Sequence, residues 1–455
     1  MLRVSGAGFG SVALAALSNA DAQDAAPLSP RATHFAPKAK RVIFLFMHGG
    51  PSHMDTFDYK PQLSKDHGQP LPFDKPRVFS AQTGNLLGSP WKFQQHGQSG
   101  AWVSELFPEV AKYVDDLCII NSMHGSNSRH GGALLELHTG SDTFIRPSMG
   151  SWITYGLGTE NQNLPGFVTI CPTLTHGGAN AYSSAFLPAD YQGTPLGNAG
   201  TPSDQAKIPF IQNHGGLPAD LQRLELDLLG QMNRRRLEQT GPDAALEGRI
   251  NSFELAFRMQ MTAPELQDIA SEPESVHKLY GIDDPATRNF GIQCLMARRF
   301  SERGVRFVQA THSYKWDQHD GLKTALPQNA KEVDRPIAAL LTDLKSRGLL
   351  NETLVLWGGE FGRTPVSQNG DNGRDHNPQG YTMWMAGGGV RGGMQYGATD
   401  EYGYYAVQNK VHLHDLHATL LHLLGLDHTR LTYRYAGRDF RLTDVYGDVV
   451  HDVIA

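Results

Sequence analysis

The sequence predicts an α/β fold in which a mainly parallel central sheet is sandwiched by helices. Short apolar runs rich in β-branched and aromatic residues recur along the chain, and helical stretches separate them. Several runs end in glycines followed by polar side chains, which is typical of a parallel strand that reaches the edge of its sheet. Because strands that alternate with helices form βαβ units, the sheet should be mainly parallel.

The length and composition favour a large globular domain. The chain has 455 residues, 40% of them hydrophobic, and its mean hydropathy is −0.38. We expect a single domain over residues 41–455, with a helical segment at about 217–347. A net charge of −6 and the lack of a basic cluster argue against nucleic acid as a partner. We expect no integral membrane segment, and the sequence leaves the oligomeric state open.

Residues 1–25 resemble an export signal. They are weakly apolar, rich in small residues and end in Ala20-Asp21-Ala22, an A-x-A type cleavage pattern. Met1-Leu2-Arg3 resembles the tail of a twin-arginine signal whose arginine pair is missing, so we expect that a few upstream residues were lost. The hypothesis is export to the periplasm or beyond by the twin-arginine route, with residues 26–40 as a linker. The alternative is an N-terminus without a targeting role.

Five strands and one short helix are expected along the domain. The first strand is Arg41–Met47, and the helix is Gly132–His138. The other strands are expected at Leu117–Ser122, Phe167–Cys171, Val305–Ala310 and Leu354–Trp357. Apart from the strand that begins at Val305, the chain between Leu217 and Arg347 should be mostly helical, because apolar residues recur three and four apart.

Polar side chains that can bind metal follow the first strand. The turn just after it contains His48, Ser52, His53, Asp55 and Asp58. Ligands of open α/β sheets bind beyond the carboxyl ends of the strands. Imidazole and carboxylate side chains at this edge therefore predict a metal site. The alternative is a polar loop with chance His and Asp residues.

Four later segments place similar side chains after strands or nearby in the sequence. They contribute Ser126, Ser128, Arg129 and His130; His312, Asp317, His319 and Asp320; Glu360 and Arg363; and Asp375 and His376. The first set lies at the head of a helix, where backbone N–H groups favour an anion. Any one segment alone could be an ordinary surface loop, but together they suit Zn, Mn, Ca or Mg. Two such ions about 3.5 to 4 Å apart could clamp a phosphoryl or sulfuryl group.

Several longer motifs resemble known families. Two segments resemble sulfatase elements: LHDLHATLLHLLGLD and NSRHGGALLELHTG. The chain from the first strand onward resembles the exported bacterial proteins grouped as domain of unknown function 1501, through HGGPSHMDTFDYKP, RPSMGSWITYGLG, WGGEFGRTP, GRDHNPQGY and LTYRYAGRDFRLTDVYG. That group is placed in the alkaline phosphatase and sulfatase superfamily, so the resemblance implies an alkaline phosphatase/sulfatase-like fold.

The resemblance also implies roles for single residues. Superfamily hydrolases carry a nucleophile where this chain has Ser126, and the absence of Cys there leaves formylglycine chemistry unsupported. Their metal-binding elements correspond to Glu360, to Asp317-Gln318-His319 and to His376. The first metal-binding Asp of those enzymes corresponds to His48, unless Asp55 takes its place.

Two accounts of function follow from these residues. In the first, the protein is a metal-dependent hydrolase of a phosphate or sulfate ester, either a small molecule or a polysaccharide. One ion would be held by His48 or Asp55 with His130 and Glu360, and another by Asp317, His319 and His376. Ser126 or water would attack, while Arg129 and Arg363 would hold the non-bridging oxygens.

In the second account, the protein is a non-catalytic exported binding or structural module that keeps the fold with a degenerate metal site. A third interpretation, a serine hydrolase with His48-Gly49-Gly50 as its oxyanion loop, fails because the sequence has no G-x-S-x-G elbow.

Overall fold

The computed structural model describes residues 28–74, 84–209, 211, 218–241, 243–368, 370 and 372–455. The expected export signal, residues 1–25, lies outside this part. Of the expected linker, residues 28–40 run along the body of the domain. There the backbone N–H groups of Lys38 and Ala39 both donate to the carbonyl of Leu423, and His34 N–H donates to Gly425.

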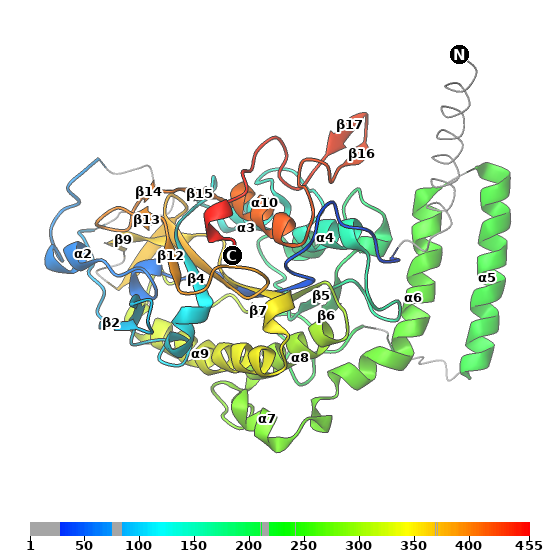
Figure 1. Cartoon of the computed structure of the whole chain (residues 1–455), viewed down its shortest axis with the longest axis horizontal. Coiled ribbons are helices and arrows are strands. Elements are labelled where there is room, and N and C mark those ends of the chain that lie inside the picture. Colours follow the sequence, from blue (N-terminus) through cyan, green and yellow to red (C-terminus); the bar gives the residue numbers. More distant parts are fainter. Residues whose placement is uncertain are drawn as a thin grey trace, which may run out of the picture.

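A nine-stranded sheet runs through the middle of the molecule (Figure 1). Its order is β12-β4-β11-β8-β1-β7-β5-β6, and β15 pairs with β4. Among the described strands of this sheet, only β11 runs antiparallel to its neighbours. The strands are β1 (Arg41–Met47), β4 (Leu117–His124), β5 (Phe167–Ile170), β6 (Thr194–Leu196), β7 (Phe307–His312), β8 (Thr353–Gly358), β11 (Tyr381–Ala386), β12 (Met394–Tyr396) and β15 (Val411–His412).

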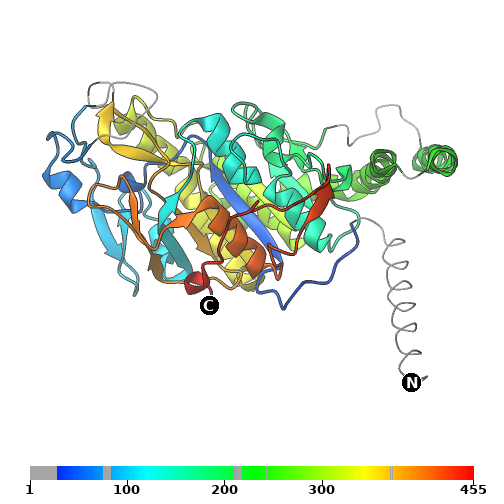
Figure 2. The same ribbon diagram turned by 90° about the horizontal axis from the view of Figure 1, so that it is seen from above.

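Helices cover both faces of this sheet, as Figures 1 and 2 show. The helices on one face are α3 (His130–Thr139), α4 (Met149–Leu157) and α10 (Leu413–Leu423), and those on the other are α8 (Arg288–Glu302) and α9 (Leu322–Ser346). The remaining helices are α2 (Pro61–Lys65), α5 (Ala219–Thr240), α6 (Ala244–Gln267) and α7 (Glu274–Leu279). The predicted fold class, a mainly parallel sheet sandwiched by helices, is confirmed.

Short hairpins and 3-10 helices complete the domain. The hairpins are β2 (Phe93–His96) with β3 (Ala101–Ser104), β9 (Gly362–Gln368) with β10 (Gly373–Asn377), β13 (Ala398–Thr399) with β14 (Ala406–Gln408), and β16 (Tyr433–Tyr435) with β17 (Arg438–Phe440). The 3-10 helices are His53–Asp55, Val110–Asp116, Gly178–Tyr182, Ala189–Tyr191, Ile269–Ser271, Leu350–Glu352 and His451–Val453. In the part of the chain that the structure describes, every helix is too short or too polar to cross a membrane.

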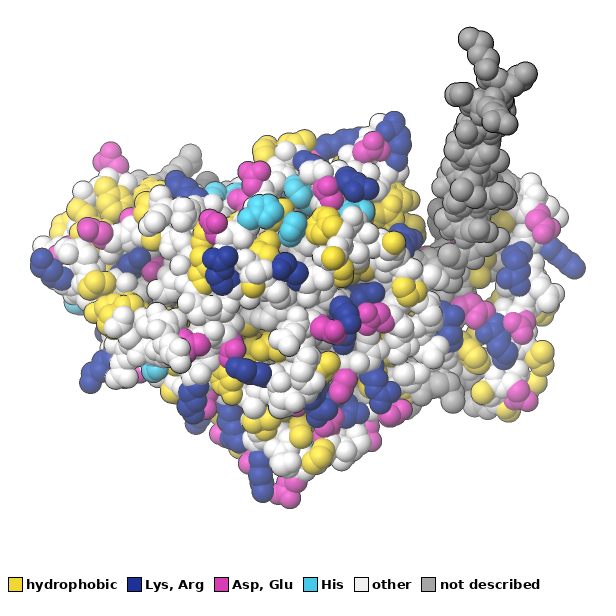
Figure 3. Space-filling view, in the orientation of Figure 1, with side chains coloured by type: hydrophobic (Ala, Val, Ile, Leu, Met, Phe, Trp, Pro, Cys, Tyr) yellow, Lys and Arg dark blue, Asp and Glu magenta, His cyan; other side chains and the backbone are white. Residues whose placement is uncertain are grey.

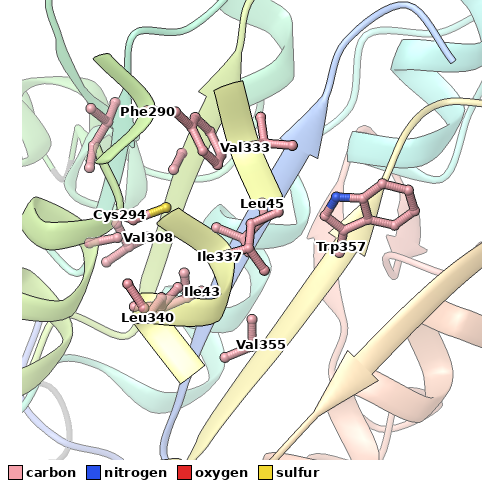
Figure 4. Packing of buried hydrophobic residues seen from close by; sticks show 14 of the residues in the cluster. Ile43, Leu45, Phe290, Cys294, Val308, Val333, Ile337, Leu340, Val355 and Trp357 are labelled. Atoms are coloured by element: carbon pink, nitrogen blue, oxygen red, sulfur yellow. The ribbon is translucent and has the colours of Figure 1, made fainter. Parts of the chain in front are cut away.

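Strand β1 lies at the centre because both of its faces are apolar. Ile43 and Leu45 point into one core with residues of α8 and α9, as the close view in Figure 4 shows. Phe44 and Phe46 point to the opposite face and pack with α3, α4 and α10. Alternation with a period of two gives each core every second side chain. An uninterrupted apolar run is therefore what this central parallel strand requires.

All five expected strands are present, as β1, β4, β5, β7 and β8. The bounds of β1 agree with the prediction at both ends. Strand β7 begins two residues later than expected, at Phe307. The reason is a turn at the end of α8, in which Val305 N–H donates to the carbonyl of Phe300.

Candidate metal centre

The carboxyl ends of the central strands bring distant side chains to one place. Met47 of β1 lies opposite His312 of β7, and Phe46 lies opposite Gly358 of β8. The segments that follow these strands therefore leave the sheet side by side. Strand β4 ends at the same edge, because it runs antiparallel to β11, which itself runs antiparallel to β8.

Four side chains converge there: His130 at the start of α3, Asp317 and His319 after β7, and His376 on β10. Asp317 Oδ1 lies 3.2 Å from His130 Nε2. It lies 3.0 Å from Nε2 of His319 and 3.0 Å from Nε2 of His376. The Nε2 atoms of His319 and His376 are 2.9 Å apart. Three imidazole nitrogens and one carboxylate oxygen thus surround a single point.

The other ring nitrogen of each histidine faces an oxygen. Nδ1 of His130 lies 2.7 Å from Glu360 Oε1. Nδ1 of His376 lies 2.7 Å from the carbonyl oxygen of Ser128, and Nδ1 of His319 lies 2.6 Å from Gln368 Oε1. Because an ionised carboxylate and a carbonyl only accept, Nδ1 of His130 and of His376 must carry the proton. With Gln368 oriented as its oxygen is placed, the same holds for His319, so each Nε2 presents a lone pair to the cluster.

This arrangement suits a cation. Lone pairs on Nε2 of His319 and His376 that face each other repel unless a proton or a metal ion lies between them. Zinc at 2.0 to 2.1 Å from four tetrahedral ligands would separate those ligands by about 3.3 Å, close to the separations seen here. Imidazoles that donate their second N–H to an oxygen are the usual form of metal-binding histidine. The donor set therefore fits a divalent ion.

The charges around the cluster also favour a cation. Burial would lower the pKa of His130, but hydrogen bonds to Asp317 and Glu360 raise it overall. Burial would raise the pKa of Glu360, but its hydrogen bond with His130 and the nearby His48 bring it down to about 2. Two ionised carboxylates therefore flank the His130 ring, and the environment that favours a proton there also favours a metal ion.

His48 lies beside this cluster. It is fully buried, and in the part of the chain that the structure describes neither ring nitrogen has a hydrogen-bond partner. Burial lowers the pKa of His48 to about 4, against the opposing effect of Glu360. A ligand atom of His48 lies within 4.8 Å of ligand atoms of His130 and His176, which makes a second group able to hold a metal.

Asp55 is placed differently. Its side chain is fully buried, with Oδ2 at 2.7 Å from Arg374 Nε and Oδ1 at 3.2 Å from Nη2. Ser52 Oγ donates to the same carboxylate at 2.5 Å. Arg374 and the hydroxyl of Ser52 thus satisfy the charge of Asp55.

Arg363 connects the segments that form the site. The guanidinium is fully buried and lies 2.7 Å from Asp317 Oδ1. Its N–H groups also donate to backbone carbonyls of Gly49, Gly50, Trp316 and Arg374. These acceptors come from the turn after β1, the segment after β7 and strand β10. The side chain fixes the position of Asp317 and is committed to protein acceptors.

Ser126 and Arg129 are exposed on the loop between β4 and α3. Ser126 Oγ lies 3.2 Å from His412 Nε2. Because His412 Nδ1 accepts a hydrogen bond from His414 N–H, Nε2 must carry the proton and donate to Ser126. Ser126 and His412 line a cavity of about 720 Å³ beside α10. Histidine side chains gather on the surface there, as Figure 3 shows.

A family model described as "Protein of unknown function (DUF1501)" matches residues 39–454. The chain belongs to the DUF1501 family. No curated protein matches this DUF1501 sequence.

Solved structures similar to this DUF1501 protein include a lipoteichoic acid synthase, an alkaline phosphatase and a sulfatase. The lipoteichoic acid synthase LtaP from Listeria monocytogenes is 9% identical, with a TM-score of 0.37 over 91% of this chain and 78% of that one. The alkaline phosphatase from the Antarctic bacterium TAB5 is 10% identical, with a TM-score of 0.35 over 85% and 98%. The PsFucS1 sulfatase from Pseudoalteromonas sp. is 12% identical, with a TM-score of 0.33 over 92% and 71%. Likenesses this distant say nothing about the reaction of this chain.

Three residues of the centre were not among those expected from the sequence. His176 follows β5 by six residues, so the rule that selected the other segments applies to it as well. Tyr314, after β7, donates its hydroxyl to Asp317. Gln368 lies on β9, in a stretch without other candidate ligands, and nothing in the sequence marks it as the residue that orients His319.

Proposed function

We propose that this DUF1501 protein is a metal-dependent hydrolase of phosphate or sulfate esters. Its divalent ion would be held by four ligands: His130, Asp317, His319 and His376. The observation that carries the proposal is the orientation of the three imidazoles. Each has Nδ1 on an oxygen acceptor and directs Nε2 at Asp317 Oδ1.

The donor set narrows the choice of ion. Three nitrogens and one oxygen suit borderline metals, so Zn²⁺ or Mn²⁺ is favoured over Ca²⁺ and Mg²⁺, which prefer oxygen ligands. A second ion between His48 and His176 would require His130 to change partners, because its ring nitrogens already face Glu360 and Asp317. We therefore assign the principal site to the group around Asp317.

The chain's own residues would prepare the site for ester hydrolysis. A bound divalent ion would supply a Lewis acid and lower the pKa of water. Arg363 fixes Asp317 by a buried ion pair, and Glu360 fixes the ring of His130 while accepting from Gly49 N–H at 3.1 Å. Arg129, exposed at the head of α3, would bind the non-bridging oxygens of the ester, since guanidinium matches such oxyanions. The first turn of α3 adds its positive dipole end.

Water is favoured over Ser126 as the attacking group. A serine nucleophile that no metal ion activates needs a base that accepts its proton. His412 instead donates its Nε2 proton to Ser126, because its Nδ1 already accepts from His414 N–H. We infer that Ser126 keeps its proton and contributes to the adjacent cavity.

The same observation favours a second candidate function. A protein with an intact metal site and an unactivated serine could be a binding or structural module without turnover. The module would share the metal ligands, so only the reaction separates the two candidates.

One experiment tests both. The full chain is purified, its metal content is measured, and hydrolysis of an aryl phosphate, an aryl phosphodiester and an aryl sulfate is assayed. We expect about one ion per chain and hydrolysis of at least one ester, both lost in His319→Ala. The matched control is His451→Ala, which removes an exposed histidine and should change neither quantity. Metal without hydrolysis would favour the module, and protein that binds no metal would overturn the hydrolase.

The cellular location of the protein and the size of its substrate are further parts of the proposal. A polysaccharide ester is as acceptable as a small ester, because Arg129 is exposed. Export by the twin-arginine route rests on residues 1–25. Retention of the full-length protein in the cytoplasm of cells lacking the twin-arginine translocase, with export in the parent strain, would support the route. Export in both strains would refute it.

A further inference from the structure

Helix α5 is the outermost element of the domain. It lies beside α6 and projects from the body in both views (Figures 1 and 2). With 22 residues it is ~33 Å long at 1.5 Å per residue. Of its residues, only Gly230 is buried. A helix of this length is marginal unless one face packs on something.

One face of α5 packs on α6. Arg223 forms an ion pair with Glu254 of α6, with Nη2 2.5 Å from Oε1. Its guanidinium also lies 5.2 Å from the centroid of the Phe257 ring. The side chains of Leu226 and Leu237 are half-buried on this same face. These contacts fix which side of α5 turns away from α6.

The opposite face of α5 carries a second apolar row. We call Leu221, Leu224, Leu228 and Met232 the outer stripe. Their side chains are 46%, 62%, 59% and 58% exposed, respectively. At about 100° per residue they fall within an arc of about 80°, and that arc lies opposite Leu226 and Leu237. An exposed apolar row of this length on a folded chain marks a surface on which a partner, such as another helix, packs.

Charge along α5 indicates what that helix is. The first half of α5 carries Asp220, Glu225 and Asp227 against one arginine, and Asp227 pairs with that arginine, Arg223. The second half carries three successive arginines against one acid, Glu238: Arg234, Arg235 and Arg236. An identical helix placed antiparallel would set its basic half against this acidic half. A parallel copy would set like charges together.

We propose that the outer stripe is a dimer interface, on which α5 pairs antiparallel with α5 of a second copy of this chain about a two-fold axis. In the register that places Leu228 beside Leu228 of the partner subunit on the axis, Leu224 lies against Met232 of the partner subunit, and the acidic half faces the basic half. Asp220 then lies two residues, or about 3 Å along the helix, from the level of Arg234 of the partner subunit, on the same flank of the helix pair. The inference is independent of the proposed hydrolase activity.

The association state of the full chain tests the proposal. Sedimentation velocity at micromolar concentration should give twice the chain mass of 49.9 kDa. Leu228→Glu should convert the protein to a monomer, because it places buried like charges near the axis. The matched control is Leu229→Glu on the same helix, about 100° around from Leu228 and 46% exposed, which should stay dimeric.

A charge swap tests the direction of pairing. Asp220→Arg and Arg234→Asp should each weaken the dimer, and the double variant should recover it, since the opposite charges still face each other in an antiparallel pair. Far-ultraviolet circular dichroism checks that each variant keeps its helices. Monomeric wild-type protein, equal loss with Leu229→Glu, or additive loss in the double variant would each overturn the proposal.

Discussion

The Nε2 atoms of His319 and His376 lie 2.9 Å apart, although each ring has its Nδ1 on an oxygen. Two such nitrogens cannot bond to each other without a shared cation. Their closeness supports the proposed ion site, and the residues that hold these rings in place are therefore the ones to change.

Gln368 should tune metal affinity without touching the metal. Its side-chain oxygen lies 2.6 Å from His319 Nδ1 and sets the ring orientation. Removing that acceptor in Gln368→Leu should weaken metal binding about 10- to 100-fold. Competition with a chromogenic chelator measures this affinity. Gln368→Glu keeps an acceptor and should restore most of it, and equal affinity in wild type and Gln368→Leu would contradict the assignment.

Arg363 should matter for stability more than its single ion pair suggests. Arg363→Met leaves a partly buried Asp317 and four backbone carbonyls without this donor. We expect a loss of about 3 to 5 kcal/mol in the free energy of unfolding, measured by urea denaturation of metal-free protein. Arg129→Ala is the surface control and should stay within about 0.5 kcal/mol of wild type. Its effect should appear in hydrolysis instead.

Asp55 should contribute to stability and not to metal content. Asp55→Ala strands the buried guanidinium of Arg374, which should cost about 3 to 5 kcal/mol of unfolding free energy. Removing both charges together, in Asp55→Val with Arg374→Met, should recover part of that loss. Metal analysis of the folded variants provides the check: a drop in bound metal equal to that of His319→Ala would make Asp55 a ligand after all.

His417 should make the metal-free protein less stable in acid. Burial lowers the pKa of this ring to about 3, and its Nε2 donates to the carbonyl of Leu137 at 2.7 Å. The unfolded chain, with a pKa near 6.5, takes up a proton that the folded chain refuses. Its contribution to stability is therefore complete above about pH 6.5 and falls by about 1.4 kcal/mol per pH unit towards pH 3.

Urea denaturation at several pH values between about 7 and 5 measures this slope, because the unfolded His417 gains its proton in that range. His417→Leu should reduce the slope by about one proton, whereas His451→Leu, at an exposed site, should leave it unchanged. Equal slopes in wild type and His417→Leu would show that His417 titrates normally.

The sequence predicts the framework well because burial dictates it. A strand enclosed on both faces needs an unbroken apolar run, and β1 has one from Val42 to Met47. The antiparallel strand β11 was not expected, since its run from Tyr381 to Ala386 carries no sign of direction. Pairing partners, rather than local pattern, determine whether a strand runs parallel or antiparallel.

The candidate site could be predicted in its location but not in its detailed pairing. The position of a residue shortly after a strand indicates that it reaches the sheet edge, which holds for His130 and Asp317. It does not indicate which way a loop turns. Asp55 faces Arg374, more than 300 residues away in sequence, and His176 reaches the cluster from a left-handed backbone conformation with φ of 54°. Such outcomes depend on contacts between distant segments.

The hydrogen bonds of Arg363 have a consequence for the order of folding. The guanidinium joins the turn at Gly50, 313 residues earlier in the chain, to the segment after β7 and to strand β10. Contacts between such distant segments form slowly, because long loops must close first. The histidines and Asp317 meet only once these segments have closed on one another. Metal binding would then be the last step of folding and would stabilise the completed domain.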